Sequence, residues 1–255
     1  MSSEQSAEFT SESINRYLKE VAKEYRKQVG KSMPAEIILI GGASVLVNYG
    51  FRNMTTDVDA LFFAASVMKD VINKVGDRFG LPNGWMNTDF QYTSSYSPKL
   101  AEYSVYYRTY SNVLTIRTVA AEYLIAMKLC SGRQYKNDLS DVLGILGTHA
   151  QNGMPITLER IHKAVDDLYG SWDSLPKTSQ AFIVNVMEDG DYETLYQRTL
   201  QTEKDTREYL EQFNKEYPNV LTDRNVDEIV RQFRKESEEN SVLTEMYNKK
   251  SGRTI

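Results

Sequence analysis

The spacing of apolar side chains predicts an amphipathic helix at the start of the chain. Apolar residues recur at helical spacing from Ile14 to Tyr25, directly behind Thr10 and Ser11, which are favourable helix N-cap types. The pattern ends near Gly30, where the helix is expected to stop.

Short strands and further helices follow, separated by turn residues. An aliphatic run behind Pro34 stops at two glycines and gives way to a second apolar run, which is typical of a buried strand, a tight turn and a helix. A second short apolar run follows, and after it comes a segment whose apolar residues recur at helical spacing. The predicted elements are a strand at 37–40, a turn at 41–42, a helix from 43, a strand at 58–63 and a helix at 67–79.

The second half of the chain has a different pattern. Residues 85–119 are rich in aromatic and β-branched side chains, which favour two or three further strands. The helical period then returns and persists, so we expect an α/β domain over 1–119 and a helical domain over 120–255. The tail after Lys235 is highly charged and poor in large apolar residues, and we expect it to be frayed or partner-dependent.

Composition excludes several classes of protein. The chain has 255 residues, 41% of them hydrophobic and 25% charged, which suits a folded chain with a sizeable core. The net charge of −5 provides no general basic field for holding a nucleic acid, so any nucleic acid must be bound locally. No apolar run approaches the roughly 20 residues of a membrane span. The polar N-terminus and the single Cys130 predict a cytoplasmic protein without an internal disulfide.

The candidate chemistry lies between residues 39 and 63. A Gly-Gly turn before a helix allows close approach of the backbone to a ligand, and the helix N-terminus offers free N–H groups to an anion such as a triphosphate. Asp57 and Asp59 alternate along the next predicted strand, so both carboxylates face one side. Such hard oxygen ligands suit Mg²⁺, which can promote in-line displacement of pyrophosphate. The implied reaction is nucleotidyl transfer.

The same segment resembles a known superfamily. The order of strand, Gly-Gly turn and helix, followed by Arg52-x-x-Thr55-x-Asp57-x-Asp59, resembles the nucleotidyltransferases of DNA polymerase β fold. Within that superfamily it is most similar to abortive-infection and toxin-type nucleotidyltransferases and their uncharacterised relatives. A downstream block with a lysine, an arginine and paired acids extends the likeness over residues 35–147. These positions are Lys128, Arg133, Asp138 and Asp141.

The resemblance implies a mixed α/β (α+β) sheet flanked by helices and followed by a helical module. It also implies that Gly41 and Gly42 contact the triphosphate and that two aspartates bind metal. The implied metal ligands are Asp57 and Asp59. Arg52 and Lys128 would neutralise phosphate or position the acceptor.

Two departures from the family pattern affect this assignment. Gly42 replaces the serine of the usual Gly-Ser turn, which leaves Ser44 as a candidate substitute. The third carboxylate of many active members is absent from its expected strand, where Thr115 and Arg117 stand. Asp89 or Glu102 could replace it if the sheet brings one of them beside Asp57, and we favour Asp89 as the third catalytic acid.

Simpler interpretations exist for the charged residues of these motifs. Arg52 could be a surface residue that pairs with Asp57. Lys128 interrupts an apolar helix, and a buried ammonium is costly unless it faces a cleft or a carboxylate. Asp138 and Asp141 are three residues apart on a predicted helix, and we interpret them as structural supports, on a solvated face or paired with nearby Arg133 and Lys136.

Three functions remain open at this point. The first is a Mg²⁺-dependent nucleotidyltransferase that transfers NMP from an NTP to a hydroxyl of RNA, including tRNA, or of a protein. Such an enzyme could be the toxin of a toxin–antitoxin or phage-defence pair with a cognate partner protein. The second is a catalytically degenerate module that senses nucleotide or binds a partner. The third is a nucleic-acid-binding adaptor that uses basic residues of the helical half.

Overall fold

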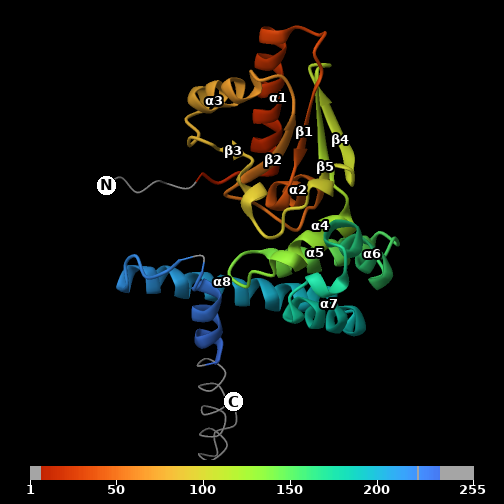
Figure 1. Cartoon of the computed structure of the whole chain (residues 1–255), viewed down its shortest axis with the longest axis vertical. Coiled ribbons are helices and arrows are strands. Elements are labelled where there is room, and N and C mark those ends of the chain that lie inside the picture. The colour runs from red at the N-terminus through yellow and green to blue at the C-terminus, as the bar shows by residue number, and fades with distance from the viewer. Residues whose placement is uncertain (1–6, 223, 236–255) are drawn as a thin grey trace, which may run out of the picture.

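The fold begins with the predicted helix (Figure 1). The computed structural model describes residues 7–222 and 224–235. Helix α1 (Ser11–Val29) starts at a capping box, in which the Ser13 backbone N–H donates to Thr10 Oγ1 and the Thr10 backbone N–H donates to Ser13 Oγ. It ends at Gly30, whose φ of 76° favours glycine. Both predicted helix ends are confirmed.

A five-stranded mixed sheet forms the centre of the first half. Its strands are β1 (Ala35–Leu39), β2 (Val58–Phe63), β3 (Met86–Asn87), β4 (Ser104–Tyr110) and β5 (Leu114–Val119), in the order β3-β2-β1-β5-β4. β1 pairs antiparallel with β2 and parallel with β5, β2 pairs parallel with β3, and β4 pairs antiparallel with β5. The predicted strand at 58–63 is confirmed at both ends.

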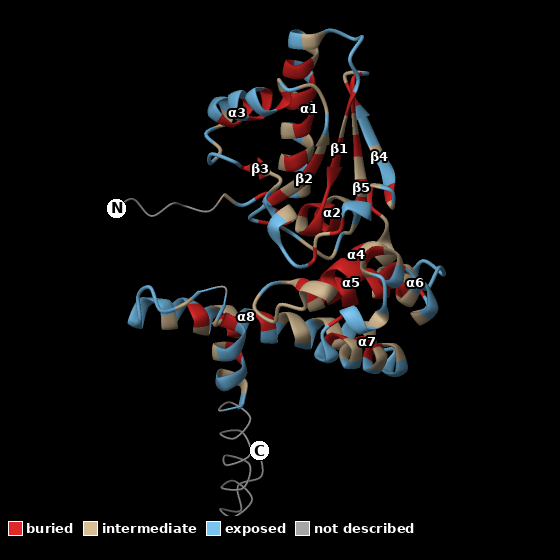
Figure 2. Ribbon diagram, viewed as in Figure 1, coloured by how far each residue is buried: buried red, intermediate tan, exposed pale blue. Residues whose placement is uncertain are grey.

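Helices cover the sheet on one face and at one end. Helices α2 (Gly41–Asn48) and α3 (Met68–Phe79) follow β1 and β2. One apolar core joins α1 and α3 to the sheet through residues such as Leu18, Val71 and Ile37. Figure 2 shows buried segments in red on α1 and on the strands of the sheet.

The second half contains only helical elements within its described part. The named elements are α4 (Ala121–Ser131), α5 (Asp138–Gln151), α6 (Leu158–Tyr169), the short 3₁₀ helix η3 (Trp172–Ser174), α7 (Lys177–Asp189) and α8 (Tyr192–Glu216). These helices lie beyond the end of the sheet at which β1 runs into α2 (Figure 1). A second core joins Ile38 and Leu61 of the sheet to α4, α5, α6 and α7, so the two halves are held together by shared apolar packing.

Residues 85–119 contain β3, β4 and β5, which confirms the two or three strands predicted for this segment. The longer strands lie in its second part, because the short 3₁₀ helices η1 (Asp89–Tyr92) and η2 (Pro98–Ala101) lie within residues 88–103. Buried Phe90 and Leu100 fix these turns to the core. The expectation for the tail after Lys235 falls outside the described residues. Among the helices that the structure describes, none is long and apolar enough to cross a membrane.

Candidate functional site

A cleft of about 740 Å³ lies where the sheet meets the helical half. Its walls come from segments far apart in the chain, namely the start of α2, the loop into β2, η1, the loop between α4 and α5, and one face of α8. Of the residues predicted for the site, all but Ser44 line this cleft. They are Gly41, Gly42, Arg52, Asp57, Asp59, Asp89 and Lys128.

The Gly-Gly turn is crowded on the side of the cleft. Gly41 has a φ of 53°, which glycine adopts without strain. A Cβ atom on Gly42 would lie 2.7 Å from Thr55 Oγ1 and 2.8 Å from Arg52 Nη2. Glycine therefore stands at this position because two neighbouring side chains occupy the space that a serine would need.

Ser44 lies elsewhere. Its side chain is fully buried in α2, and its Oγ atom has no hydrogen-bond partner among the residues that the structure describes. Ser44 is not among the residues that line the cleft. The hydroxyl that the sequence offered as a substitute for the missing serine therefore does not reach the site.

Two carboxylates project from the beginning of β2. Asp57 precedes the strand and is exposed, whereas Asp59 lies within it and is half-buried. Burial, followed by the negative charge of Asp57, raises the pKa of Asp59 to about 6. The pair fits a divalent cation, because a cation would offset both the burial of Asp59 and the repulsion between the two carboxylates.

Asp89 lines the same cleft from the start of η1, two residues after β3. Asp59 pairs in register with Asn87 of β3, and Asn87 Oδ1 accepts a 2.8 Å hydrogen bond from the Asp89 backbone N–H. The Asp89 charge contributes to the raised pKa of Asp59. Even so, no three His, Cys, Asp or Glu side chains in the described ranges are grouped closely enough to share a metal ion. Glu102 does not line the cleft.

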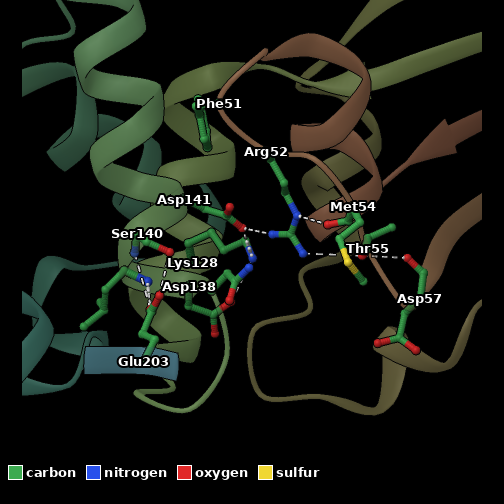
Figure 3. Close-up of polar contacts among 12 residues, drawn as sticks. Phe51, Arg52, Met54, Thr55, Asp57, Lys128, Asp138, Ser140, Asp141 and Glu203 are labelled. Atoms are coloured by element: carbon green, nitrogen blue, oxygen red, sulfur yellow. Dashed lines mark hydrogen bonds and ion pairs between the residues drawn. The ribbon is translucent and has the colours of Figure 1, made fainter. Parts of the chain in front are cut away.

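A network of buried ion pairs connects the loop before β2 with helices α4 and α5 (Figure 3). The Arg52 guanidinium binds the carboxylate of Asp141 on α5, and Arg52 Nε donates to the Met54 carbonyl at 2.9 Å. Lys128 Nζ lies 2.8 Å from Asp138 Oδ1 and 2.9 Å from Asp141 Oδ2. Arg52 of the sheet half and Lys128 of the helical half therefore share one carboxylate.

The pKa values in this network depend on burial and on the neighbouring charges. Burial alone would lower the pKa of Lys128, but the charges of Asp138 and Asp141 outweigh it and hold that pKa above its usual value. Burial would likewise raise the pKa of Asp138, yet Lys128 and Arg133 hold it well below its usual range. The network holds three cations and two carboxylates, so the carboxylate of each aspartate contacts two cations.

These contacts test the simpler interpretations of Arg52, Asp138 and Asp141 given by the sequence. The ion pair of Arg52 is with Asp141 and not with Asp57. The expectation of a solvated face for Asp138 and Asp141 is wrong, because both are buried. Asp138 pairs with Arg133 as expected, with Arg133 Nε 2.9 Å from Asp138 Oδ2, and both aspartates pair with Lys128 as well.

Sequence reasoning missed the wall that α8 contributes. Arg207 and Glu211 line the cleft, and Arg207 Nη1 donates a 2.7 Å hydrogen bond to Asn137 Oδ1. Asn137 and the exposed Lys136, from the loop before α5, line it too. The helical spacing of Arg207 and Glu211 places them on one face of α8, but nothing in the sequence indicates which element that face meets.

The fold and the site together define a class of protein. A glycine turn at the start of a helix, facing a carboxylate pair on the adjacent strand of a mixed sheet, is the arrangement expected for a nucleotidyltransferase. The chain belongs to the family described as "Nucleotidyltransferase of unknown function (DUF6036)", whose sequence model matches residues 16–169. No curated protein and no solved structure matches the chain.

Proposed function

We propose that this protein is a Mg²⁺-dependent nucleotidyltransferase that moves NMP from an NTP to the hydroxyl of an acceptor. The observation that carries the proposal is the pair Asp57 and Asp59 in a cleft opposite the Gly-Gly turn. A Cβ on Gly41 would lie 3.8 Å from Asp59 Oδ2, so the turn and the carboxylates border the same space. Membership of a nucleotidyltransferase family favours an enzyme over a binding module.

Each group has a task in this reaction. Free backbone N–H groups at the start of α2 would bind the triphosphate. Asp57 and Asp59 would hold Mg²⁺, which when bound would activate the acceptor hydroxyl and offset the charge of the departing pyrophosphate. The acceptor oxygen forms a bond to the α-phosphorus as the bond to pyrophosphate breaks, and Asp89 is our candidate to accept the hydroxyl proton.

The acceptor and the biological role follow from the resemblance to toxin-type members. We propose RNA, with tRNA among the candidates, or a protein side chain as the acceptor. In this proposal the protein acts in the cytoplasm as the toxin of a toxin–antitoxin or phage-defence pair, and a cognate antitoxin would be its partner. The helical half would recognise the acceptor or that partner.

The test combines nucleotide binding with transfer. Thermal unfolding is measured with each NTP plus Mg²⁺, and transfer is measured from α-phosphate-labelled NTP to cellular RNA and protein. A ligand at about 100 times its Kd stabilises the fold by about 2.7 kcal/mol. The Asp57→Asn, Asp59→Asn double variant should lose both effects. The matched control is the double variant Asp77→Asn, Asp166→Asn, which removes two exposed carboxylates outside the cleft.

A second candidate function is a nucleotide-sensing or partner-binding module without catalysis. It is favoured by one observation, that Asp57 and Asp59 have no third acid grouped with them for a metal ion in the described part of the chain. Metal-dependent stabilisation by an NTP without transfer to any acceptor supports this alternative. Transfer that persists unchanged in the Asp57→Asn, Asp59→Asn variant contradicts the proposed mechanism.

A further inference from the structure

We propose that Arg207 of α8, together with Lys136, binds a phosphate group of a substrate in the cleft. This inference rests on the proposed function of the same site and adds a residue that the family assignment does not reach, because the family match ends at residue 169. The ligand class is a phosphate, carried either by the nucleotide or by a nucleic-acid acceptor.

The first argument is that only some cations of the cleft are paired with carboxylates. Five cations line the cleft, and three of them, Arg52, Lys128 and Arg133, are already paired with the buried carboxylates of α5. The side chains of Lys136 and Arg207 have no carboxylate within 4 Å among residues 7–222 and 224–235. The cations free to bind an anionic substrate are therefore on the wall formed by α8 and the α4–α5 loop.

The second argument is that Arg207 is held in place before a ligand arrives. Asn137 Oδ1 accepts one of its N–H groups, which leaves the other guanidinium donors available. One turn earlier on the same face of α8, the buried Glu203 accepts hydrogen bonds from the Leu139 backbone N–H at 3.0 Å and from Ser140 Oγ at 2.5 Å. These bonds fix α8 against the start of α5, so the position of Arg207 is determined by the fold.

The third argument concerns the shape of the positive surface. Glu211, one turn beyond Arg207, lines the same wall and is exposed. The negative charge of Glu211 borders the unpaired positive surface, which consists of Lys136 and Arg207 alone among the described residues of this wall. A planar guanidinium beside a flexible ammonium suits one phosphate group, because arginine can donate two parallel hydrogen bonds to phosphate oxygens.

The experiment measures binding of three probes by calorimetry at fixed ionic strength. The probes are inorganic tripolyphosphate without metal, each NTP with Mg²⁺, and a random-sequence oligoribonucleotide. They are compared in the wild type, Arg207→Gln, Arg207→Lys and the control Lys204→Gln, which removes a charge from an exposed position of α8 outside the cleft. Thermal unfolding of each variant shows whether it is folded.

We expect Arg207→Gln to weaken phosphate binding by about tenfold, the effect of losing a charge-assisted hydrogen bond. Arg207→Lys should retain part of the affinity, and Lys204→Gln should behave as wild type. Weaker binding of tripolyphosphate and NTP identifies a nucleotide phosphate, whereas weaker binding of the oligoribonucleotide alone identifies an acceptor phosphate.

Two results would overturn the inference. One is a folded Arg207→Gln variant that binds all three probes as the wild type does, and the other is a wild type that binds none of them. The proposed function fails separately, since it is refuted when the Asp57→Asn, Asp59→Asn variant still transfers nucleotide. Loss of transfer in that variant with unchanged phosphate binding in Arg207→Gln leaves the proposed function intact and removes only this inference.

Discussion

Replacing Gly42 by alanine tests the effect of close packing at the Gly-Gly turn. The new Cβ would lie 2.7 Å from Thr55 Oγ1 and 2.8 Å from Arg52 Nη2, closer than such atoms approach one another in folded proteins. Thr55 cannot move easily, because its backbone N–H and C=O both bond to Phe9. Arg52 cannot move without disturbing its ion pair with Asp141.

The expected magnitude is a balance of two opposing effects. Overpacking in a closely packed region costs about 1–3 kcal/mol of unfolding free energy. Alanine is favoured over glycine by up to about 1 kcal/mol inside a helix, and Gly42 is the second residue of α2. We therefore expect a net loss of about 1–2 kcal/mol. At about 2–4 °C for each kcal/mol in a chain of this size, the unfolding midpoint should fall by about 2–8 °C.

The matched control is Gly50→Ala. No atom lies within 4 Å of a Cβ built on Gly50, and neither Gly50 nor Gly42 has a positive φ. Both changes therefore add the same methyl group to a backbone that accepts it. They differ in the space around that group and in the helix propensity that favours alanine at position 42, so crowding must outweigh that propensity for Gly42→Ala to be the less stable variant. Urea unfolding followed by circular dichroism measures both variants. Equal unfolding free energies for the two alanine variants would refute the packing argument.

Two further predictions concern the buried charges. Lys128→Met should cost about 3–5 kcal/mol of unfolding free energy, because the buried carboxylates of Asp138 and Asp141 lose a shared cation, whereas Lys136→Met should cost little. Denaturant titration of the two variants checks this, and similar costs would contradict it. Burial raises the pKa of Glu203 from 4.5 to about 7, so folding favours its protonated form and stability should fall as the pH rises from about 4.5 to 7, by up to about 3 kcal/mol. Glu203→Gln should remove this decline in unfolding curves recorded between pH 4.5 and 8, and an unchanged slope would show that other groups cause it.

Local patterns in the sequence predicted much of the fold. Helix α1 was predictable at both ends because its start and stop depend on adjacent residues, Thr10 and Gly30. Strand β2 was predictable because a short, mostly apolar run directly follows the polar segment 55–57. Between 85 and 103 no period repeats, and buried side chains such as Leu100 fix the chain by contacts with distant elements.

In the candidate site, too, residues close in sequence were predictable and contacts between distant segments were not. The residues singled out on the Gly-Gly turn and on β2 are near in sequence, and their spacing alone suggested a common site. The pairing of Arg52 with Asp141 joins positions 89 residues apart, and no local pattern indicates it. The place of Arg207 depends on how α8 packs against α5, which helical periodicity does not determine.

The parallel pairing of β1 with β5 has a consequence for the order in which the protein forms during synthesis. Ala35 pairs with Leu114, so the centre of the sheet waits for about 80 residues of intervening chain. Arg207 leaves the ribosome about 90 residues after β5, which takes on the order of 5–20 s at typical rates of translation. The nascent chain can thus place β2, with Asp57 before it and Asp59 on it, in the sheet before the opposite wall of the cleft has been made. A ribosome-bound chain that ends before α8 would present these aspartates on a formed sheet with one side of the cleft still open.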